Sequence, residues 1–156
     1  MIRKRRAFAR PRKAYELSRI KEENKIVEKY GLKNKREIWK TLAKINYFRG
    51  RAKDLSKKSL EEQELFLGKL RAIGLNTNTL ADVLALKVEN LLDRRLSNVV
   101  FKKGIASTSK EARQMITHKR IIVDEQIVKS PGYIVYVNEE NLIKLKNKIS
   151  KEKKDE

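Results

Sequence analysis

The spacing of apolar residues predicts that the N-terminal part of the chain is helical. Apolar side chains recur every three or four positions, as they do on the buried side of an amphipathic helix. The predicted helices cover residues 14–30, 34–53, 59–73, 77–84 and 88–104, and three of them end at Gly31, Gly74 and Gly104. Two pairs, Asn34 with Glu37 and Ser59 with Glu62, have the spacing of a capping box at a helix start.

The predicted helix over residues 34–53 has two distinct sides. The side that we expect to face the core consists of Ile38, Leu42, Ile45, Phe48 and Ala52. The opposite side is cationic and consists of Arg36, Lys40, Lys44, Tyr47 and Arg51. A charged side that is merely solvated is the ordinary alternative. Because no acidic residue interrupts this side, the pattern also favours contact with phosphate groups.

After residue 108 the pattern changes from helix to strand. Thr108 and Glu111 form a capping box for a helix over residues 109–118. The strands predicted beyond it cover residues 121–123, 126–128 and 133–137, with Asp124 and Glu125 between the first two. The predicted fold class is therefore α+β: an N-terminal helical bundle, then a small α/β module in which two helices precede a short, twisted antiparallel sheet.

The composition adds a strong positive charge to this picture. The 156 residues include 39 Lys and Arg against 20 Asp and Glu, a formal net charge of +19, which indicates a polyanionic partner. With no cysteine and one histidine, the sequence excludes disulfides, a thiol nucleophile and the usual zinc sites, and we predict no metal or cofactor. No apolar run approaches the roughly 20 residues of a membrane span and no signal peptide is recognisable, so we expect a cytosolic protein.

The charge is concentrated in particular segments. Residues 1–13 hold seven basic and no acidic side chains, so we predict a basic arm that orders along phosphates rather than a solvated tail. The arm's candidate contacts are Arg5, Arg6, Arg10 and Arg12. We divide the chain into this arm, a helical domain over 14–92, a module over 93–138 that begins as early as about residue 88, and a charged C-terminal helix or tail over 139–156.

A family resemblance indicates which polyanion the chain is expected to bind. The segments at residues 92–96 (LDRRL), 103–106 (KGIA), 112–116 (ARQMI) and 130–133 (SPGY), with His118, Ile121 and Val123, closely resemble the RNA-binding module of small-subunit ribosomal protein four. The upstream run YGLKNKREIW at residues 30–39 is similar to the archaeal and eukaryotic branch of the same family. The resemblance extends over roughly residues 11–145.

The resemblance implies a structural constituent of the small ribosomal subunit. It implies a primary binder of small-subunit rRNA at a multi-helix junction, which helps to nucleate assembly of the subunit body and lies near the channel through which mRNA enters. The implied partners are small-subunit rRNA, neighbouring ribosomal proteins and mRNA. The implied RNA contacts fall on Arg94, Arg95, Lys102, Lys103, Ser109, Lys110, Arg113, Gln114, His118, Lys119 and Arg120. A-form RNA hides its base edges, so we expect little sequence readout.

The chain departs from the family pattern at two turns. Lys119 stands where the family usually has glycine, and Asp124-Glu125 stands where it usually has Asn-Gly. A non-glycine residue with positive φ costs on the order of 1 kcal/mol, which the fold should survive. We hypothesise that Lys119 offsets this strain by contacting a phosphate.

Three alternatives remain open from the sequence. The same module occurs in RNA-modifying enzymes such as pseudouridine synthases, but this chain has no room for such a catalytic domain, so we predict no enzyme activity. A free-standing RNA-binding quality-control protein with the same module would lack the upstream run at residues 30–39. Non-specific compaction of nucleic acid would need only the charge.

Overall fold

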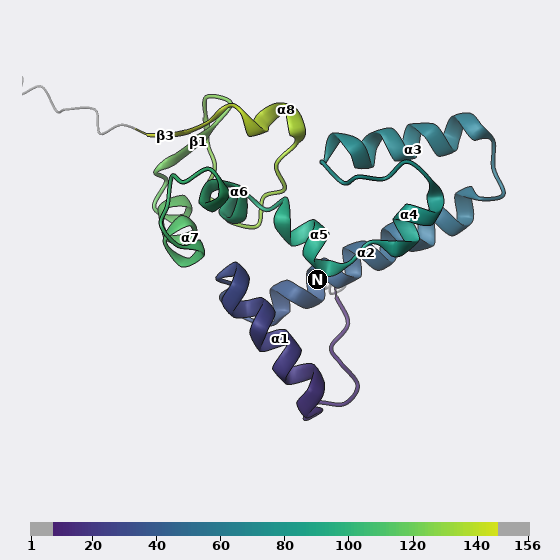
Figure 1. Cartoon of the computed structure of the whole chain (residues 1–156), viewed down its shortest axis with the longest axis horizontal. Helices are drawn as coiled ribbons and strands as arrows, with labels where there is room; N and C mark the ends of the chain where they lie inside the picture. Colours follow the sequence, from purple (N-terminus) through teal and green to yellow (C-terminus); the bar gives the residue numbers. More distant parts are fainter. Residues whose placement is uncertain (1–7, 147–156) are drawn as a thin grey trace, which may run out of the picture.

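The computed structural model describes residues 8–146 and has the predicted α+β class. The helical part consists of α1 (Leu17–Tyr30), α2 (Arg36–Leu55), α3 (Leu60–Ala72), α4 (Leu80–Ala85) and α5 (Val88–Asp93). The rest, residues 94–146, is called the C-terminal module and contains α6 (Leu96–Lys102), α7 (Ser109–Thr117), β1 (Ile121–Val123), β2 (Gln126–Ile127), α8 (Val137–Glu140) and β3 (Ile143–Leu145). Helix α3 and the C-terminal end of α2 lie at the opposite end of the molecule from the C-terminal module, with α5 between them (Figure 1).

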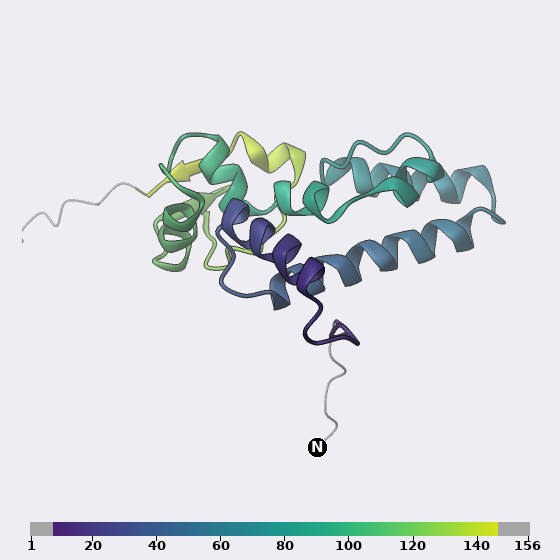
Figure 2. The same cartoon turned by 60° about the horizontal axis from the view of Figure 1, so that its bottom comes forward.

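Helix α2 contacts α3, α4 and α5 and so organises the helical part. Its buried side chains include Ile38, Ile45 and Ala52, as predicted, and they pack with α4 and α5. The prediction for Leu42 is wrong, because this side chain is 42% exposed and Thr41 is buried in its place. Figure 2 shows α2 along one side of the helical part, with α3 and α4 on the other.

The start of α7 packs closely on the end of α1. Gly31 ends α1 in the left-handed conformation with φ 57°, as its position predicts. A Cβ atom at Gly31 would lie 2.9 Å from the backbone nitrogen of Lys110, so glycine is also needed for the close approach. The Ser109 hydroxyl donates a hydrogen bond to the Lys29 carbonyl oxygen across the same contact (3.3 Å).

The predicted capping pairs have mixed outcomes. Thr108 caps α7 by accepting a hydrogen bond from the Glu111 amide (3.1 Å), but the Glu111 carboxylate binds the Ser107 amide rather than that of Thr108. Ser59 precedes α3 without a capping hydrogen bond from its side chain. At the start of α2 the N-cap residue is Lys35 rather than Asn34, and its side chain makes no capping hydrogen bond. The Glu37 carboxylate accepts from the Lys33 amide (3.3 Å) and from the partners described below.

The helix predicted over residues 88–104 is two helices. The chain between α5 and α6 is extended at Arg95, with φ −73° and ψ 141°. There the Arg94 carbonyl oxygen accepts from the Val135 amide, and the Leu96 amide donates to the Tyr133 carbonyl oxygen. This short antiparallel pairing of Arg95 with Ile134 interrupts the helix. Because the apolar residues keep a helical spacing on both sides of the interruption, their pattern did not reveal it.

The sheet has the strand order β2-β1-β3, and both pairings are antiparallel. Strands β1 and β2 were predicted, but the third strand is wrong: it is Ile143–Leu145 rather than residues 133–137. Residues 133–135 bond to the α5–α6 junction instead, and Val137 begins α8. Part of the segment expected to be a charged helix or tail therefore belongs to the sheet. The tail beyond residue 146 lies outside the described residues.

Within the part of the chain that the structure describes, three clusters of buried side chains hold the fold together. One lies in the C-terminal module and includes Leu96, Val100 and Ile116, and a second joins α2, α3 and α4. The third contains Tyr30, Leu32, Ile38 and Leu92, so it links α1 and α2 to α5 at the base of the C-terminal module. Burial of this kind contributes roughly 25 cal/mol for each Å² of apolar surface.

The two unusual turns have left-handed backbones without glycine. Lys119 has φ 59°, and Asp124 and Glu125 have φ 48° and 64°. We expect Lys119→Gly to raise the free energy of unfolding by about 0.5–1 kcal/mol, because glycine relieves the strain but makes the unfolded chain more flexible. Urea denaturation of both proteins measures this difference. An unchanged or lower stability of the variant would contradict it.

Candidate nucleic-acid interface

The cationic side of α2 is solvent-exposed along its length. The exposure expected for this side is confirmed for all five of its residues, Arg36, Lys40, Lys44, Tyr47 and Arg51. The Tyr47 ring, 67% exposed, stands among the cations and tilts against Phe48, with 6.1 Å between the ring centres. An aromatic ring within a row of cations can stack on a nucleobase while its neighbours contact phosphates.

Three residues of this cationic side, Arg36, Lys40 and Lys44, lie on one wall of a groove of about 630 Å³. The opposite wall comes from the C-terminal module, through Arg113 of α7 and the loop at Ser130, Pro131 and Gly132. Charged residues along the groove are Lys33, Arg36, Glu37, Lys40, Lys44, Arg95 and Arg113. Six of these seven are basic, so the groove as a whole attracts anions.

Among residues 8–146, Glu37 is the one carboxylate that lines the groove, and it joins the helical part to the C-terminal module. Its Oε1 accepts from Arg113 Nη2 (2.8 Å) and its Oε2 from Arg113 Nη1 (3.1 Å), a two-pronged ion pair. Oε2 also accepts from Arg95 Nη2 at 2.5 Å. The side chain of Glu37 is 16% exposed and those of Arg95 and Arg113 are 10% and 21% exposed, so water screens the cluster weakly. Glu37 therefore fixes the position of the groove's two walls.

A second carboxylate, Glu23, joins α1 to α2. Its Oε1 accepts from Trp39 Nε1 (2.9 Å) and from Arg19 Nη1 (2.8 Å), and Lys35 lies 3.5 Å from its Oε2. Burial alone would raise the pKa of Glu23, but the hydrogen bonds and cations outweigh it and the pKa lies below its usual range. The same balance, with Arg113 and Arg95 as donors, lowers the pKa of Glu37.

These lowered pKa values predict a loss of stability in acid. A carboxylate whose pKa is lower in the folded state stabilises the fold above its unfolded pKa, near 4.3, and that contribution disappears as the pH falls through the folded pKa. We expect the unfolding free energy to drop between about pH 6 and pH 3, and to drop less in Glu23→Gln, which lacks one of the two groups. Urea titrations at several pH values measure this. An equal loss of unfolding free energy with acid in the wild type and in Glu23→Gln would contradict this prediction.

Arg94 and Arg95 have intramolecular partners rather than free guanidinium groups. Arg94 donates to the carbonyl oxygen of Ile73 (2.9 Å), to Glu140 Oε2 (3.0 Å) and to the Val135 carbonyl oxygen (3.3 Å). A Cβ at Gly74, which has φ 83°, would lie 2.5 Å from Arg94 Nε. Arg95 is buried against Glu37. The geometry thus favours a role for both arginines in holding the module to α2 and α3, and it does not bring them to the surface with the other predicted contacts.

The other predicted residues of the module divide into two groups. Lys102 lies 3.4 Å from Asp93, Lys103 donates to the Glu140 carbonyl oxygen, and Ser109 is buried against α1. Lys102 and Lys103 are themselves exposed. The second group is exposed as well and consists of Lys110, Gln114, His118, Lys119 and Arg120. Within residues 8–146 no side-chain hydrogen bond engages these five, and they lie along the outer side of α7 and the loop that follows it.

The arm is fastened to the helical part just before α1. The Phe8 ring lies 6.0 Å from the Trp39 ring, and Arg19 Nη2 donates to the carbonyl oxygens of Lys13 and Ala14 at 2.8 and 3.0 Å. Arg10 and Arg12, between these two anchors, are exposed. The arm contacts predicted at Arg5 and Arg6 lie outside the described residues.

Comparisons with known proteins decide the family. The S4 domain matches residues 94–141, which make up most of the C-terminal module. Small ribosomal subunit protein uS4 of Thermoplasma acidophilum is 43% identical over 146 residues, covering 87% of this chain and 73% of the relative. The uS4 proteins of Saccharolobus islandicus and Saccharolobus solfataricus are 46% identical over 133 residues, covering 80% of this chain and 73% of theirs. The chain belongs to the uS4 family.

Membership of the uS4 family confirms the resemblance found in the sequence. The matched length extends far upstream of the S4 domain, which a protein sharing only that domain would not show. Among the described residues, no cluster of three or more His, Asp or Glu side chains could hold a metal ion. Over that same stretch, 8–146, no helix is long and apolar enough to cross a membrane.

Sequence reasoning missed the residue that organises the groove. Glu37 was interpreted as a capping residue because of its spacing from Asn34. Its carboxylate does accept from the nearby Lys33 amide (3.3 Å), but its two arginine partners lie 58 and 76 positions along the chain. Lys33 and the loop at residues 130–132 also line the groove and were not predicted as contacts. The only available signal was that Glu37 is the single acid within the basic run at residues 33–40.

Proposed function

We propose that the protein is a structural constituent of the small ribosomal subunit and binds small-subunit rRNA through the groove between α2 and the S4 domain. The observation that carries this proposal is the uninterrupted cationic side of α2, which is exposed and faces the S4 domain of a uS4-family chain across that groove. Its relatives are named as proteins of the small ribosomal subunit, and the excess of 19 positive charges matches a polyanionic partner. The protein then acts in the cytoplasm, within the ribosome.

The proposed contacts form two surfaces of one body. The first is the α2 side with Arg36, Lys40, Lys44, Tyr47 and Arg51, and the second is the outer side of α7 with Lys110, Gln114, His118, Lys119 and Arg120. Arg113 lines the groove opposite the α2 side and is paired with Glu37, while Arg94 and Arg95 hold the S4 domain in place through their intramolecular contacts. Arginine and lysine side chains at these spacings bind phosphates, and recognition of folded RNA follows from the fixed arrangement of the two surfaces.

The finer parts of the proposal concern assembly and position. A protein whose two RNA-binding surfaces are tied together by Glu37 can hold two RNA segments in a fixed relation, which supports early binding and nucleation of the subunit body. Arg10 and Arg12 of the arm extend the positive surface beyond α1. Neighbouring ribosomal proteins and mRNA near its channel complete the proposed partners, and we propose no enzyme activity.

Co-sedimentation tests this proposal with the native protein. Ribosomal subunits separated on a gradient after a moderate salt wash should carry the protein in the small-subunit fraction. Recovery at the top of the gradient, or equally with both subunits, would contradict a constituent of the small subunit.

A further inference from the structure

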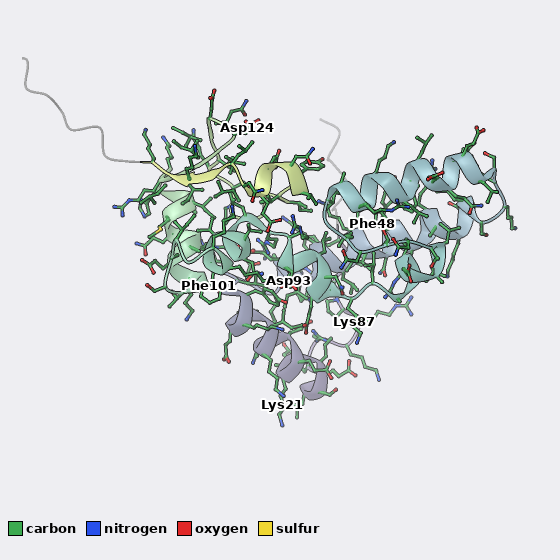
Figure 3. The ribbon with its side chains drawn as sticks, turned by 45° about the horizontal axis from the view of Figure 1, so that its top comes forward. Lys21, Phe48, Lys87, Asp93, Phe101 and Asp124 are labelled. Atoms are coloured by element: carbon green, nitrogen blue, oxygen red, sulfur yellow. The ribbon has the colours of Figure 1, made fainter. Side chains whose placement is uncertain are left out.

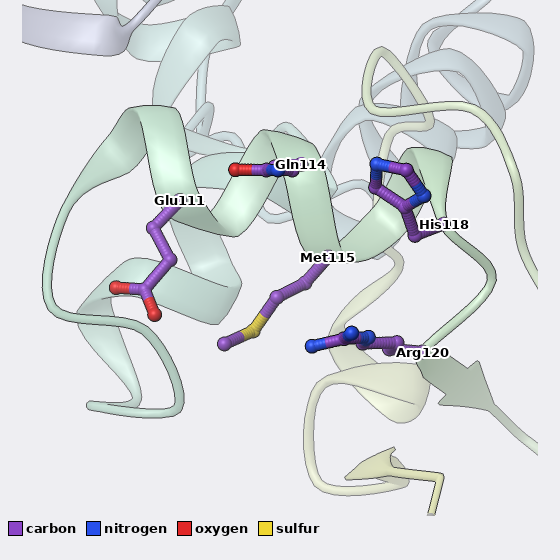
Figure 4. A pocket seen from close by; sticks show the side chains of 5 residues that line it. All are labelled: Glu111, Gln114, Met115, His118 and Arg120. Carbon is purple, nitrogen blue, oxygen red and sulfur yellow. The ribbon is translucent and has the colours of Figure 1, made fainter.

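A second hollow lies on the outer side of α7, away from the walls of the groove. It has a volume of about 250 Å³ and is lined by Glu111, Gln114, Met115, His118 and Arg120 (Figure 4). This is several times the volume of one water molecule, roughly 30 Å³, and smaller than the pockets that take drug-sized ligands. The hollow therefore has room for one flat ring system.

The lining chemistry differs from that of a phosphate site. The thioether side chain of Met115 extends between Glu111 and Arg120 in Figure 4 and packs from below against the core of the S4 domain. A polarizable thioether makes favourable contact with an aromatic ring. A carboxylate at the rim repels phosphate but accepts hydrogen bonds from N–H groups. The hollow therefore has an apolar surface at Met115, hydrogen-bond donors at Arg120 and an acceptor at Glu111, a combination that suits a nucleobase.

The polar groups around Met115 are free to bind a ligand. Glu111 uses Oε2 to accept from the Ser107 amide (2.8 Å), and within residues 8–146 its Oε1 has no hydrogen-bond donor. Arg120 is fixed through its backbone, where its amide donates to the Met115 carbonyl oxygen and its carbonyl oxygen accepts from the Lys146 amide. Its guanidinium, like the Gln114 amide and the His118 ring, has no hydrogen bond within the described part of the chain.

We propose that this hollow binds one unstacked base of the rRNA and that Glu111 and Arg120 select guanine. The inference rests on the proposed function. Guanine presents N1–H and N2–H₂ donors on one edge, which match a carboxylate, and O6 and N7 acceptors beside them, which match a guanidinium. Adenine fits less well. It keeps the N7 acceptor, but its N6–H₂ donor would face Arg120 and its N1 acceptor would face Glu111. Unstacked bases are the parts of RNA that proteins read in this way.

Three short single-stranded RNAs separate this proposal from phosphate binding. The pentamers UUGUU, UUIUU and UUAUU carry the same phosphates and differ only in the central base, where I is inosine, which lacks the N2 amine. By fluorescence anisotropy with the full chain, we expect UUGUU to bind about tenfold tighter than UUAUU, with UUIUU in between. Equal affinity for all three would overturn the base site.

Two variants and one matched control locate the effect. Glu111→Gln should lose most of the preference for UUGUU, although it removes a negative charge, and it keeps an acceptor for the Ser107 amide. Arg120→Gln should lose the preference as well, and thermal unfolding of each variant checks that it is folded. Lys110→Gln, whose side chain does not line the hollow, should weaken all three pentamers equally. Preference retained in both hollow variants would overturn the proposal.

The outcomes distinguish this proposal from the proposed function. If the wild-type chain binds folded small-subunit rRNA but shows no preference among the pentamers, the base site is wrong and the ribosomal role stands. If the chain does not bind folded rRNA preferentially, the proposed function fails whatever the pentamers show.

Discussion

Replacing Glu37 by alanine is expected to lower the free energy of unfolding by about 3 kcal/mol. The change leaves the guanidinium groups of Arg95 and Arg113 facing each other at the contact between α2 and the S4 domain, without the carboxylate that neutralises them. Removing one partner of a weakly solvated ion pair typically costs this much, whereas an exposed pair contributes less than about 1 kcal/mol. Urea denaturation followed by circular dichroism measures the difference.

Glu62→Ala provides the matched control for this prediction. Glu62 also pairs with a cation, Lys58 at 3.0 Å, but both side chains are 49% exposed. We expect its loss to change stability by less than about 1 kcal/mol. Similar effects of the two substitutions would show that Glu37 does not join the two parts. Higher rRNA affinity of the Glu37 variant with unchanged stability would show that Glu37 acts only as a local negative charge.

Replacing Arg36, Lys40 and Lys44 together by glutamine is expected to weaken rRNA binding by roughly 100-fold or more at about 0.1 M salt. Each phosphate contact releases counterions from the RNA on binding, and this release sets how steeply affinity depends on salt. Without the three contacts, the slope of log affinity against log salt concentration should become shallower by about 2 to 3. Glutamine keeps a high helix propensity, so α2 itself should persist. Filter binding across a salt series, with the small-subunit rRNA as ligand, gives both quantities.

A second triple variant controls for the loss of charge alone. Lys21, Lys25 and Lys57 are also exposed but do not line the groove, and Lys21 extends from the outer side of α1 in Figure 3. Their replacement by glutamine removes the same three charges. If the groove binds the RNA, this control should lose less than about tenfold in affinity. Equal losses in the two triple variants would contradict a localised interface.

The sequence was sufficient at several places where structure depends on neighbours along the chain, although the capping pairs at Asn34 and Ser59 did not form. The two sides of α2 follow from helical periodicity, and the helix end at Gly31 follows from the freedom of glycine at positive φ. The start of α7 follows from Thr108, three residues before Glu111. In the same way, the basic side of α2 could be recognised as a candidate site because its residues recur on one side of one helix.

The errors arise where distant segments meet. The break between α5 and α6 depends on the pairing of Arg95 with Ile134. The third strand is at 143–145 because β1 pairs with these residues and not with 133–137. Glu37, Arg95 and Arg113 are separated by up to 76 positions, so no local pattern could show that two predicted RNA contacts bind a carboxylate of α2. The residues themselves were recognisable, but their partners were not.

Competition between folded RNA and DNA tests the central claim most directly. At about 0.15 M salt, the full chain is bound to labelled small-subunit rRNA and challenged with unlabelled rRNA or with mixed-sequence duplex DNA of equal length. A shape-specific rRNA-binding protein should require at least about 1,000-fold more DNA than rRNA to release the label. Release at equal concentrations of the two would mean that the charge binds any polyanion, and it would contradict specific recognition of rRNA by the groove.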